Sequence, residues 1–172
     1  MKTDKNHQEK VTVLNKCIPF LNSIGIQTIF RKIEATCFLP GLQIENGNIV
    51  IDMDALQHPG DILHEAGHIA VVPSATRLSM DQQTIIDSRN RESEEMMAIA
   101  WSYAACIHLE LDPFVVFHES GYKGGGKNIV ENFQAGRLIG TPMLQWCKMT
   151  VEPGHALPGQ QVFPKMLTWI RE

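Results

Sequence analysis

The sequence has no uninterrupted apolar run near the roughly 20 residues that a membrane-spanning helix requires, and its first residues lack the apolar stretch of a secretory signal peptide. It also has no block of basic residues, and its net charge is −4. A negative charge without a basic patch disfavours contact with the phosphates of nucleic acid. These absences predict a cytoplasmic protein whose partners are neither membranes nor nucleic acids.

Cysteine is sparse, with four residues in a chain of 172 and no Cys-x-x-Cys pair. Scattered cysteines in a chain without a signal peptide are typical of reduced, mostly buried thiols, and no disulfide is indicated. The four are Cys17, Cys37, Cys106 and Cys147. Repeats and low-complexity segments are absent too, and the 44% hydrophobic content is ordinary for a globular protein. The length therefore predicts a single domain, residues 1–172.

The first third of the chain predicts a helix, a strand and a hairpin. Apolar residues at helical spacing run from Lys10 to Ile24, and Pro19 is expected to kink or restart that helix. Branched and aromatic residues predict a strand over residues 27–33. Asn46-Gly47 is the preferred two-residue hairpin turn.

The register of that hairpin follows from its turn. It sets Ile44 opposite Ile49 and Leu42 opposite Ile51, all on one face. The hairpin therefore has one apolar side to lay on a helix.

The segment His64-Glu65-Ala66-Gly67-His68 predicts a metal site. In a helix the two imidazoles stand about 6 Å apart along the axis and on one face, so both reach one divalent ion. Glu65 then lies beside the ion, where it can hold and deprotonate a bound water. Residues 61–72 are otherwise apolar, as in a buried helix. The alternative, a surface helix with two incidental histidines, would carry more polar residues.

A catalytic zinc site usually takes three protein ligands and leaves the fourth position to water. The metzincin extension would require glycine and histidine where this chain has Val71 and Ser74. A second helix is predicted over residues 91–111, and it opens with Glu92-Ser93-Glu94-Glu95. A carboxylate from this helix is therefore the expected third ligand.

Two adjacent carboxylates compete for that position. We favour Glu95, because its face continues into small residues that would let the two helices approach closely. Those small residues are Ala98, Ser102 and Ala105, with Ala66, Gly67 and Ala70 on the first helix. Glu94 remains the rival ligand, and Glu92 is either a hydrogen-bond partner of a ligating histidine or a solvated charge.

The remaining segments give weaker patterns. Residues 74–90 predict a loop with at most a short helical turn, and 121–127 a flexible glycine-rich loop. Strands are expected at 114–117 and 143–149, and helices at 128–139, capped by Asn128, and near 163–170. His118 and Tyr122 could each donate a hydrogen bond to a reacting oxyanion, or they are an ordinary loop histidine and a half-buried tyrosine without a catalytic role. We favour His118 as the catalytic group, because a strand end is a firmer platform than a glycine loop.

The chain resembles the ImmA/IrrE family of small cytoplasmic zinc metallopeptidases. The resemblance lies in a hairpin that leads into His-Glu-x-x-His and in a following helix that opens with clustered Glu and continues through small apolar residues. The resemblance covers roughly residues 25–111. It implies an α+β, zincin-like core, in which a small sheet packs on the helix with the motif and a second helix supplies a ligand. In that family the two His and a Glu about 27 residues later bind zinc, and the first Glu of the motif is the general base. These roles map to His64, His68, Glu95 and Glu65.

The function expected from these residues is zinc-dependent hydrolysis of peptide bonds in a peptide or protein substrate, with Zn²⁺ as cofactor. The alternative is a metal-bound regulatory or protein-interaction module without catalysis. A metal-assisted enzyme acting on a small molecule is a weaker third hypothesis. Glu65 separates the first two, because a non-catalytic module has little need of a carboxylate that is not a ligand.

Overall fold

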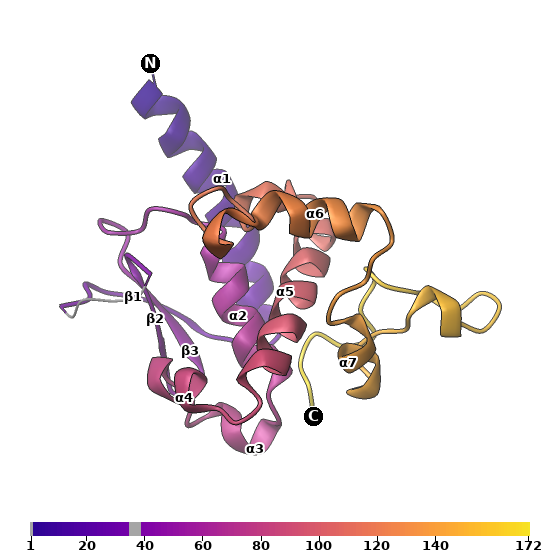
Figure 1. Ribbon diagram of the computed structural model, residues 1–172. Coiled ribbons are helices and arrows are strands. Elements are labelled where there is room, and N and C mark those ends of the chain that lie inside the picture. The colour runs from indigo at the N-terminus through magenta and orange to yellow at the C-terminus, as the bar shows by residue number, and fades with distance from the viewer. Residues whose placement is uncertain (1, 35–38) are drawn as a thin grey trace.

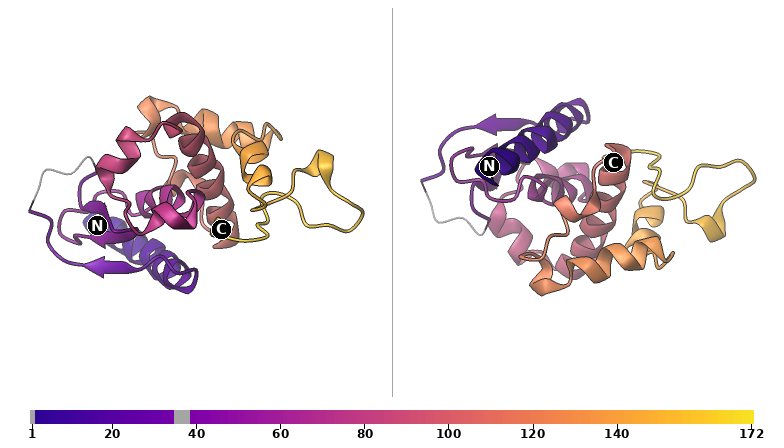
Figure 2. Two further views of the ribbon diagram at one scale, coloured as in Figure 1. Left: turned by 90° about the horizontal axis from the view of Figure 1, so that it is seen from below. Right: turned by 90° about the horizontal axis from the view of Figure 1, so that it is seen from above.

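Two helices that lie side by side form the centre of the computed structural model, which describes residues 2–34 and 39–172 (Figure 1). They are α2 (Asp61–Val71) and α5 (Arg91–His108). A small sheet and α1 (Lys2–Ser23) cover one side of this pair, and α6 (Gly126–Gln134) lies across the other (Figure 2). The α+β class is therefore confirmed. Among the described residues, no helix is both long and apolar enough to cross a membrane.

The sheet has three strands in the order β1-β3-β2. They are β1 (Thr28–Phe30), β2 (Leu42–Glu45) and β3 (Asn48–Ile51). The predicted hairpin register is confirmed, with Leu42 opposite Ile51 and Ile44 opposite Ile49. Both residues of the Asn46-Gly47 turn have positive φ, as this turn requires. β1 pairs in parallel with β3, a partner that the sequence pattern did not identify.

One core extends from the sheet and α1 through α2 to α5. The inward side chains of the hairpin are fully or almost fully buried, and so is nearly every residue of α2. α1 adds an apolar stripe that contacts α2 and β1. Of the two outcomes expected at Pro19, a restart is wrong, since α1 continues to Ser23, and a kink stays a prediction. Proline has a helical φ and removes one backbone donor, which a helix held by tertiary packing can tolerate.

The cysteines agree with the expectation of reduced, mostly buried thiols. Cys17 and Cys106 are buried and Cys147 is partly buried, and all three are free. Burial raises the pKa of Cys17 to about 12, so its thiol stays protonated. Cys37 lies outside the described residues.

α2 and α5 approach closely where both carry small residues. A Cβ added to Gly67 would lie 2.9 Å from the carbonyl oxygen of Ala98 and 3.2 Å from the Ser102 hydroxyl. Only glycine therefore fits at this crossing without a shift of one helix. The Ser102 hydroxyl has a single proton, which it shares between the carbonyl oxygen of Ala98 on its own helix, at 2.6 Å, and that of Leu63 across the interface, at 3.3 Å. The small-residue argument made from the sequence is confirmed at these positions.

The segment between these helices is more regular than expected. It contains α3 (Ser74–Arg77) and α4 (Gln82–Asp87) rather than a loop with at most one short turn. Asp81 and Thr84 form a capping box at the start of α4, in which each side chain bonds the other residue's backbone. This cap stabilises a helix whose residues are all partly or fully exposed.

The two strands expected in the last third are wrong. Residues 113–115 form a 3-10 turn, because Pro113 suits a first helical position and the Asp112 carboxylate accepts from the Phe114 amide. Residues 141–146 form α7 (Thr141–Trp146), again with a proline in the first turn. In both places the helix-start signal outweighs the apolar run that predicted a strand.

Two helix predictions in this region also need correction. α6 begins at Gly126 and ends at Gln134, so Asn128 lies inside it and is not its cap. Residues 163–170 contain no helix. That segment is held by tertiary contacts instead, including a bridge between Thr150 and Met166. The chain around Pro153–His155 projects away from the body (Figure 2).

The C-terminal segment returns to cap α2. The Arg171 amide donates to Ala70, and its guanidinium donates to Val71. Arg77 donates to the carbonyl oxygens of Ile69 and Val72. Two cations thus bond the last carbonyl groups of the helix, where the helix dipole is negative.

Candidate metal centre

α2 places its two motif histidines on the face that meets α5. The His64 and His68 Nε2 atoms lie 3.2 Å apart, with the rings nearly perpendicular. Both side chains are largely buried. The one-turn spacing in the sequence therefore brings two ring nitrogens to one point, as predicted.

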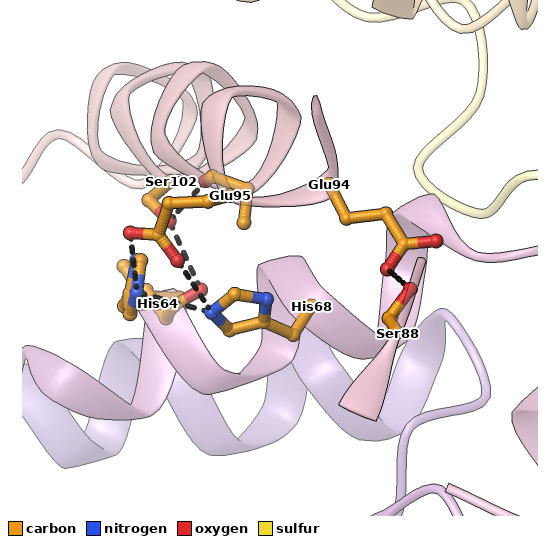
Figure 3. A network of polar contacts seen from close by, with 8 residues as sticks. His64, His68, Ser88, Glu94, Glu95 and Ser102 are labelled. Carbon is orange, nitrogen blue, oxygen red and sulfur yellow. Dashed lines mark hydrogen bonds and ion pairs between the residues drawn. The ribbon is translucent and has the colours of Figure 1, made fainter. Parts of the chain in front are cut away.

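α5 supplies the third group. The Glu95 carboxylate lies with Oε1 3.5 Å from His64 Nε2 and Oε2 3.2 Å from His68 Nε2 (Figure 3). Glu94 points away and accepts a hydrogen bond of 2.7 Å from the Ser88 hydroxyl. Glu92 is exposed and belongs to no hydrogen bond or ion pair in the described chain, which agrees with a solvated charge. The structure thus brings Glu95, and not its rivals, to the histidines.

The spacing of these three groups suits a small metal ion. Two ligand atoms at about 2.0–2.1 Å from a tetrahedral ion are separated by about 3.3–3.4 Å. The three contacts here measure 3.2, 3.2 and 3.5 Å. Among the described residues, this is the one group of three such side chains close enough to hold an ion. The set of two imidazoles and a carboxylate fits a divalent cation.

The protonation of the cluster fits the same picture. Burial lowers the pKa of His64 to about 3, so this ring is neutral with a free lone pair. Burial is the largest single influence on His68 and opposes its charge, but the hydrogen bond with Glu95 and the nearby carboxylate charges together raise the pKa of His68. Burial likewise opposes charge on Glu95, but the same bond and the neighbouring positive charges together lower the pKa of Glu95. A cation that binds both groups can replace this contact.

Glu65 lies beside the cluster without being part of it. Its side chain is only 4% exposed, and its Oε2 atom has no hydrogen-bond partner in the described chain. Burial raises the pKa of Glu65 to about 7. A buried carboxylate oxygen without a partner is costly, and such groups are concentrated at functional sites.

His118 lies near the start of α2. Its Nε2 atom is 2.9 Å from Asp61 Oδ1, and its ring stacks on His58 with centroids 3.7 Å apart. The other ring nitrogen, Nδ1, is buried and has no partner in the described chain. The strand that was expected to support His118 is absent, and Asp61 holds the ring instead. A catalytic role for His118 stays a prediction.

Tyr122 is the aromatic residue that contacts the cluster directly. Its ring meets the His64 ring edge-on, at 5.4 Å between centroids and 81° between planes. His64 Nδ1 is buried and has no hydrogen-bond partner among the described residues. Packing against Tyr122 therefore takes the orienting role that a hydrogen bond usually has at a ligating histidine. The sequence marked Tyr122 as a candidate but ranked it behind His118.

No model of a known protein family matches this chain, and no curated protein or solved structure is significantly similar to it. What the site can do is therefore argued from its own residues.

Proposed function

We propose that the protein is a zinc-dependent metallopeptidase, in which His64, His68 and Glu95 bind the metal and water takes the fourth position. The observation that carries this proposal is the position of Glu65. This buried carboxylate with an unpartnered oxygen stands next to three metal-ligating groups, which are 3.2–3.5 Å apart. A purely structural metal site would use its fourth position for another protein ligand and would not require such a carboxylate.

Zinc is the metal that best suits this donor set. Two imidazole nitrogens and one carboxylate in a four-coordinate arrangement are a common catalytic zinc set. Iron or manganese can occupy similar sites, but they more often take additional oxygen ligands. Metal analysis of protein produced without added zinc distinguishes these cases.

The proposed chemistry divides between the metal and Glu65. Zinc held by His64, His68 and Glu95 would polarise a carbonyl group and would lower the pKa of a bound water from about 15.7 toward 7. Glu65 accepts the proton of the attacking water and then delivers it to the amide nitrogen as the C–N bond breaks. Its burial keeps the carboxylate free of competing water and leaves one oxygen available for that proton.

The placement of the sheet and α5 around α2 supports the proposal of a zincin-like core of the ImmA/IrrE kind. One departure concerns the residues after the proposed ligand. This chain has Met96-Met97 where that family usually has Ala-Asn. The target of hydrolysis is accordingly proposed only as a peptide or protein.

The deciding experiment compares zinc-loaded wild type with Glu65→Gln on a peptide mixture prepared from a proteome digest, with cleavage read by mass spectrometry. Glu65→Gln is expected to retain zinc and to lose on the order of 100-fold or more of the hydrolysis rate. Glu94→Gln is a matched control, because Glu94 is a neighbouring carboxylate held by Ser88. Equal cleavage by Glu65→Gln and wild type would remove Glu65 from the mechanism. Zinc binding without cleavage by wild type would favour a non-catalytic regulatory or protein-interaction module.

A further inference from the structure

The segment that carries Tyr122 has an unusual backbone. Three consecutive residues have left-handed φ angles, 52° at Tyr122, 53° at Lys123 and 79° at Gly124. For residues with a side chain such angles cost about 1–3 kcal/mol each, and they persist only where the surroundings enforce them. Strain of this kind is concentrated at functional sites, which makes the position of Tyr122 informative.

The surroundings hold this segment on both sides. The Gly121 amide donates to the His118 carbonyl, and Gly121 lies against the His118 ring, where an added Cβ would be 3.2 Å from Cε1. That ring is in turn fixed to Asp61 in the first turn of α2. Gly126 packs on the Phe117 carbonyl oxygen, where a Cβ would lie only 2.3 Å away. The loop is thereby tied to the helix that carries the histidines.

The result is a tyrosine whose ring contacts a histidine of the metal centre. Its ring stands between Phe117, at 5.2 Å, and His64, at 5.4 Å. The side chain is partly buried, so it borders the site without being enclosed in the core. Its hydroxyl makes no hydrogen bond within the described part of the chain, and a phenol at this depth normally has a partner.

The surroundings of the Tyr122 phenol favour its un-ionised form. Burial raises the pKa of Tyr122, and the negative charges of Glu95, Asp61 and Glu65 raise it further. The geometry that places the phenol at the centre is the contact of its ring with His64. An un-ionised phenol is a hydrogen-bond donor and not a base.

We infer that the Tyr122 hydroxyl donates a hydrogen bond to the oxyanion of a tetrahedral species at the metal centre, a role that rests on the proposed peptidase function. As water oxygen bonds to the carbonyl carbon, the C=O π pair moves to the carbonyl oxygen, and the charge that develops there requires a donor. The water proton moves to Glu65 and then to the departing nitrogen. Tyr122 keeps its proton throughout.

His118 positions the loop, because its Nε2 is paired with Asp61 and its Nδ1 is buried.

The test compares Tyr122→Phe with wild type and with Tyr103→Phe. Tyr103 is the other tyrosine of the chain, and it stacks on Phe133 and Phe163. Zinc content is measured first. The affinity of each zinc-loaded protein for phenylphosphonate, a tetrahedral anion, is then measured by calorimetry. Imidazole, a neutral metal ligand without an oxyanion, serves as the reference ligand.

Tyr122→Phe is expected to bind zinc and imidazole as wild type does, and to bind phenylphosphonate about 10- to 100-fold more weakly. Tyr103→Phe should match wild type for both ligands. With a cleaved peptide in hand, Tyr122→Phe should lower kcat by roughly 100-fold with little change in KM.

Three results would overturn the inference. They are unchanged phenylphosphonate affinity in Tyr122→Phe, an equal loss in Tyr103→Phe, and a parallel loss of imidazole affinity, which would assign Tyr122 to holding His64. Absence of zinc from wild type would overturn the metal centre and this role together. A protein that binds phenylphosphonate through Tyr122 but cleaves no peptide would refute the proposed function alone.

Discussion

At the scale of single residues, the third ligand depends on a choice between two adjacent carboxylates. One residue along a helix turns a side chain by about 100°. That rotation brings Glu95 between the two histidines and sends Glu94 to Ser88. The two residues have the same charge and chemistry, so a comparison between them isolates geometry.

We predict that Glu95→Gln lowers zinc affinity by about 100-fold or more, because an amide cannot supply the anionic ligand. Glu94→Gln should bind zinc with wild-type affinity. Competition with a chromophoric chelator measures both affinities, and circular dichroism checks that both variants remain folded. If Glu94→Gln lost zinc and Glu95→Gln kept it, the third ligand would be Glu94.

Single residues also show which parts of the candidate site could be predicted from the sequence. The motif predicts His64 and His68 through their spacing, and the small residues of α5 favour Glu95 through theirs. The pairing of His118 with Asp61 joins residues far apart in the chain, so no local pattern could reveal it. The ranking of His118 above Tyr122 depended on a strand that does not form.

At the scale of elements, the longer patterns and the strand expected at 27–33 predicted structure well, and the short apolar runs of the last third did not. The hairpin, α2 and α5 have a strong turn signal or several turns of consistent periodicity, and all three form. In the last third, apolar runs of four to seven residues fit a strand or a helix equally well. Prolines at the start of 113–115 and 141–146 settle those segments as helical turns.

The contact between α2 and α5 is the element-scale feature on which the metal centre depends. We predict that Gly67→Ala separates the two helices, since its Cβ would lie 2.9 Å from the Ala98 carbonyl oxygen. Overpacking costs about 1–3 kcal/mol, and the better helix propensity of Ala returns about 1 kcal/mol. Zinc affinity should fall about 10-fold as Glu95 moves away from the histidines.

Gly154→Ala is the control for this substitution, because an added Cβ there has no neighbour within 4 Å. Chelator competition measures the zinc affinity of both variants, and thermal unfolding measures their stability. Wild-type zinc affinity in Gly67→Ala would show that the site does not depend on this helix contact.

At the scale of the whole molecule, the end of the chain closes on the helix that carries the site. The Trp169 carbonyl accepts from the Trp101 indole at 2.9 Å, and the Trp169 ring packs edge-on against Trp101 and Phe20. Arg171 then bonds the last turn of α2, which contains His68. The tail therefore connects α1, α2 and α5, three helices that come from distant parts of the sequence. No helical or strand periodicity marks this role, because the tail is held by individual contacts.

We predict that a chain ending at Thr168 unfolds at a lower temperature and binds zinc more weakly. Removing a packed Trp and the two bonds that Arg171 makes to α2 should cost about 3 kcal/mol. For a chain of this length that corresponds to a fall in Tm of roughly 6–12 °C. Zinc affinity should fall with it, because an uncapped last turn of α2 frays and loosens His68.

Deletion of Glu172 alone, an exposed residue, controls for shortening the chain. Differential scanning calorimetry with and without zinc measures both effects. If the shortened protein kept the Tm and zinc affinity of the Glu172 deletion, the tail would have no part in holding α2.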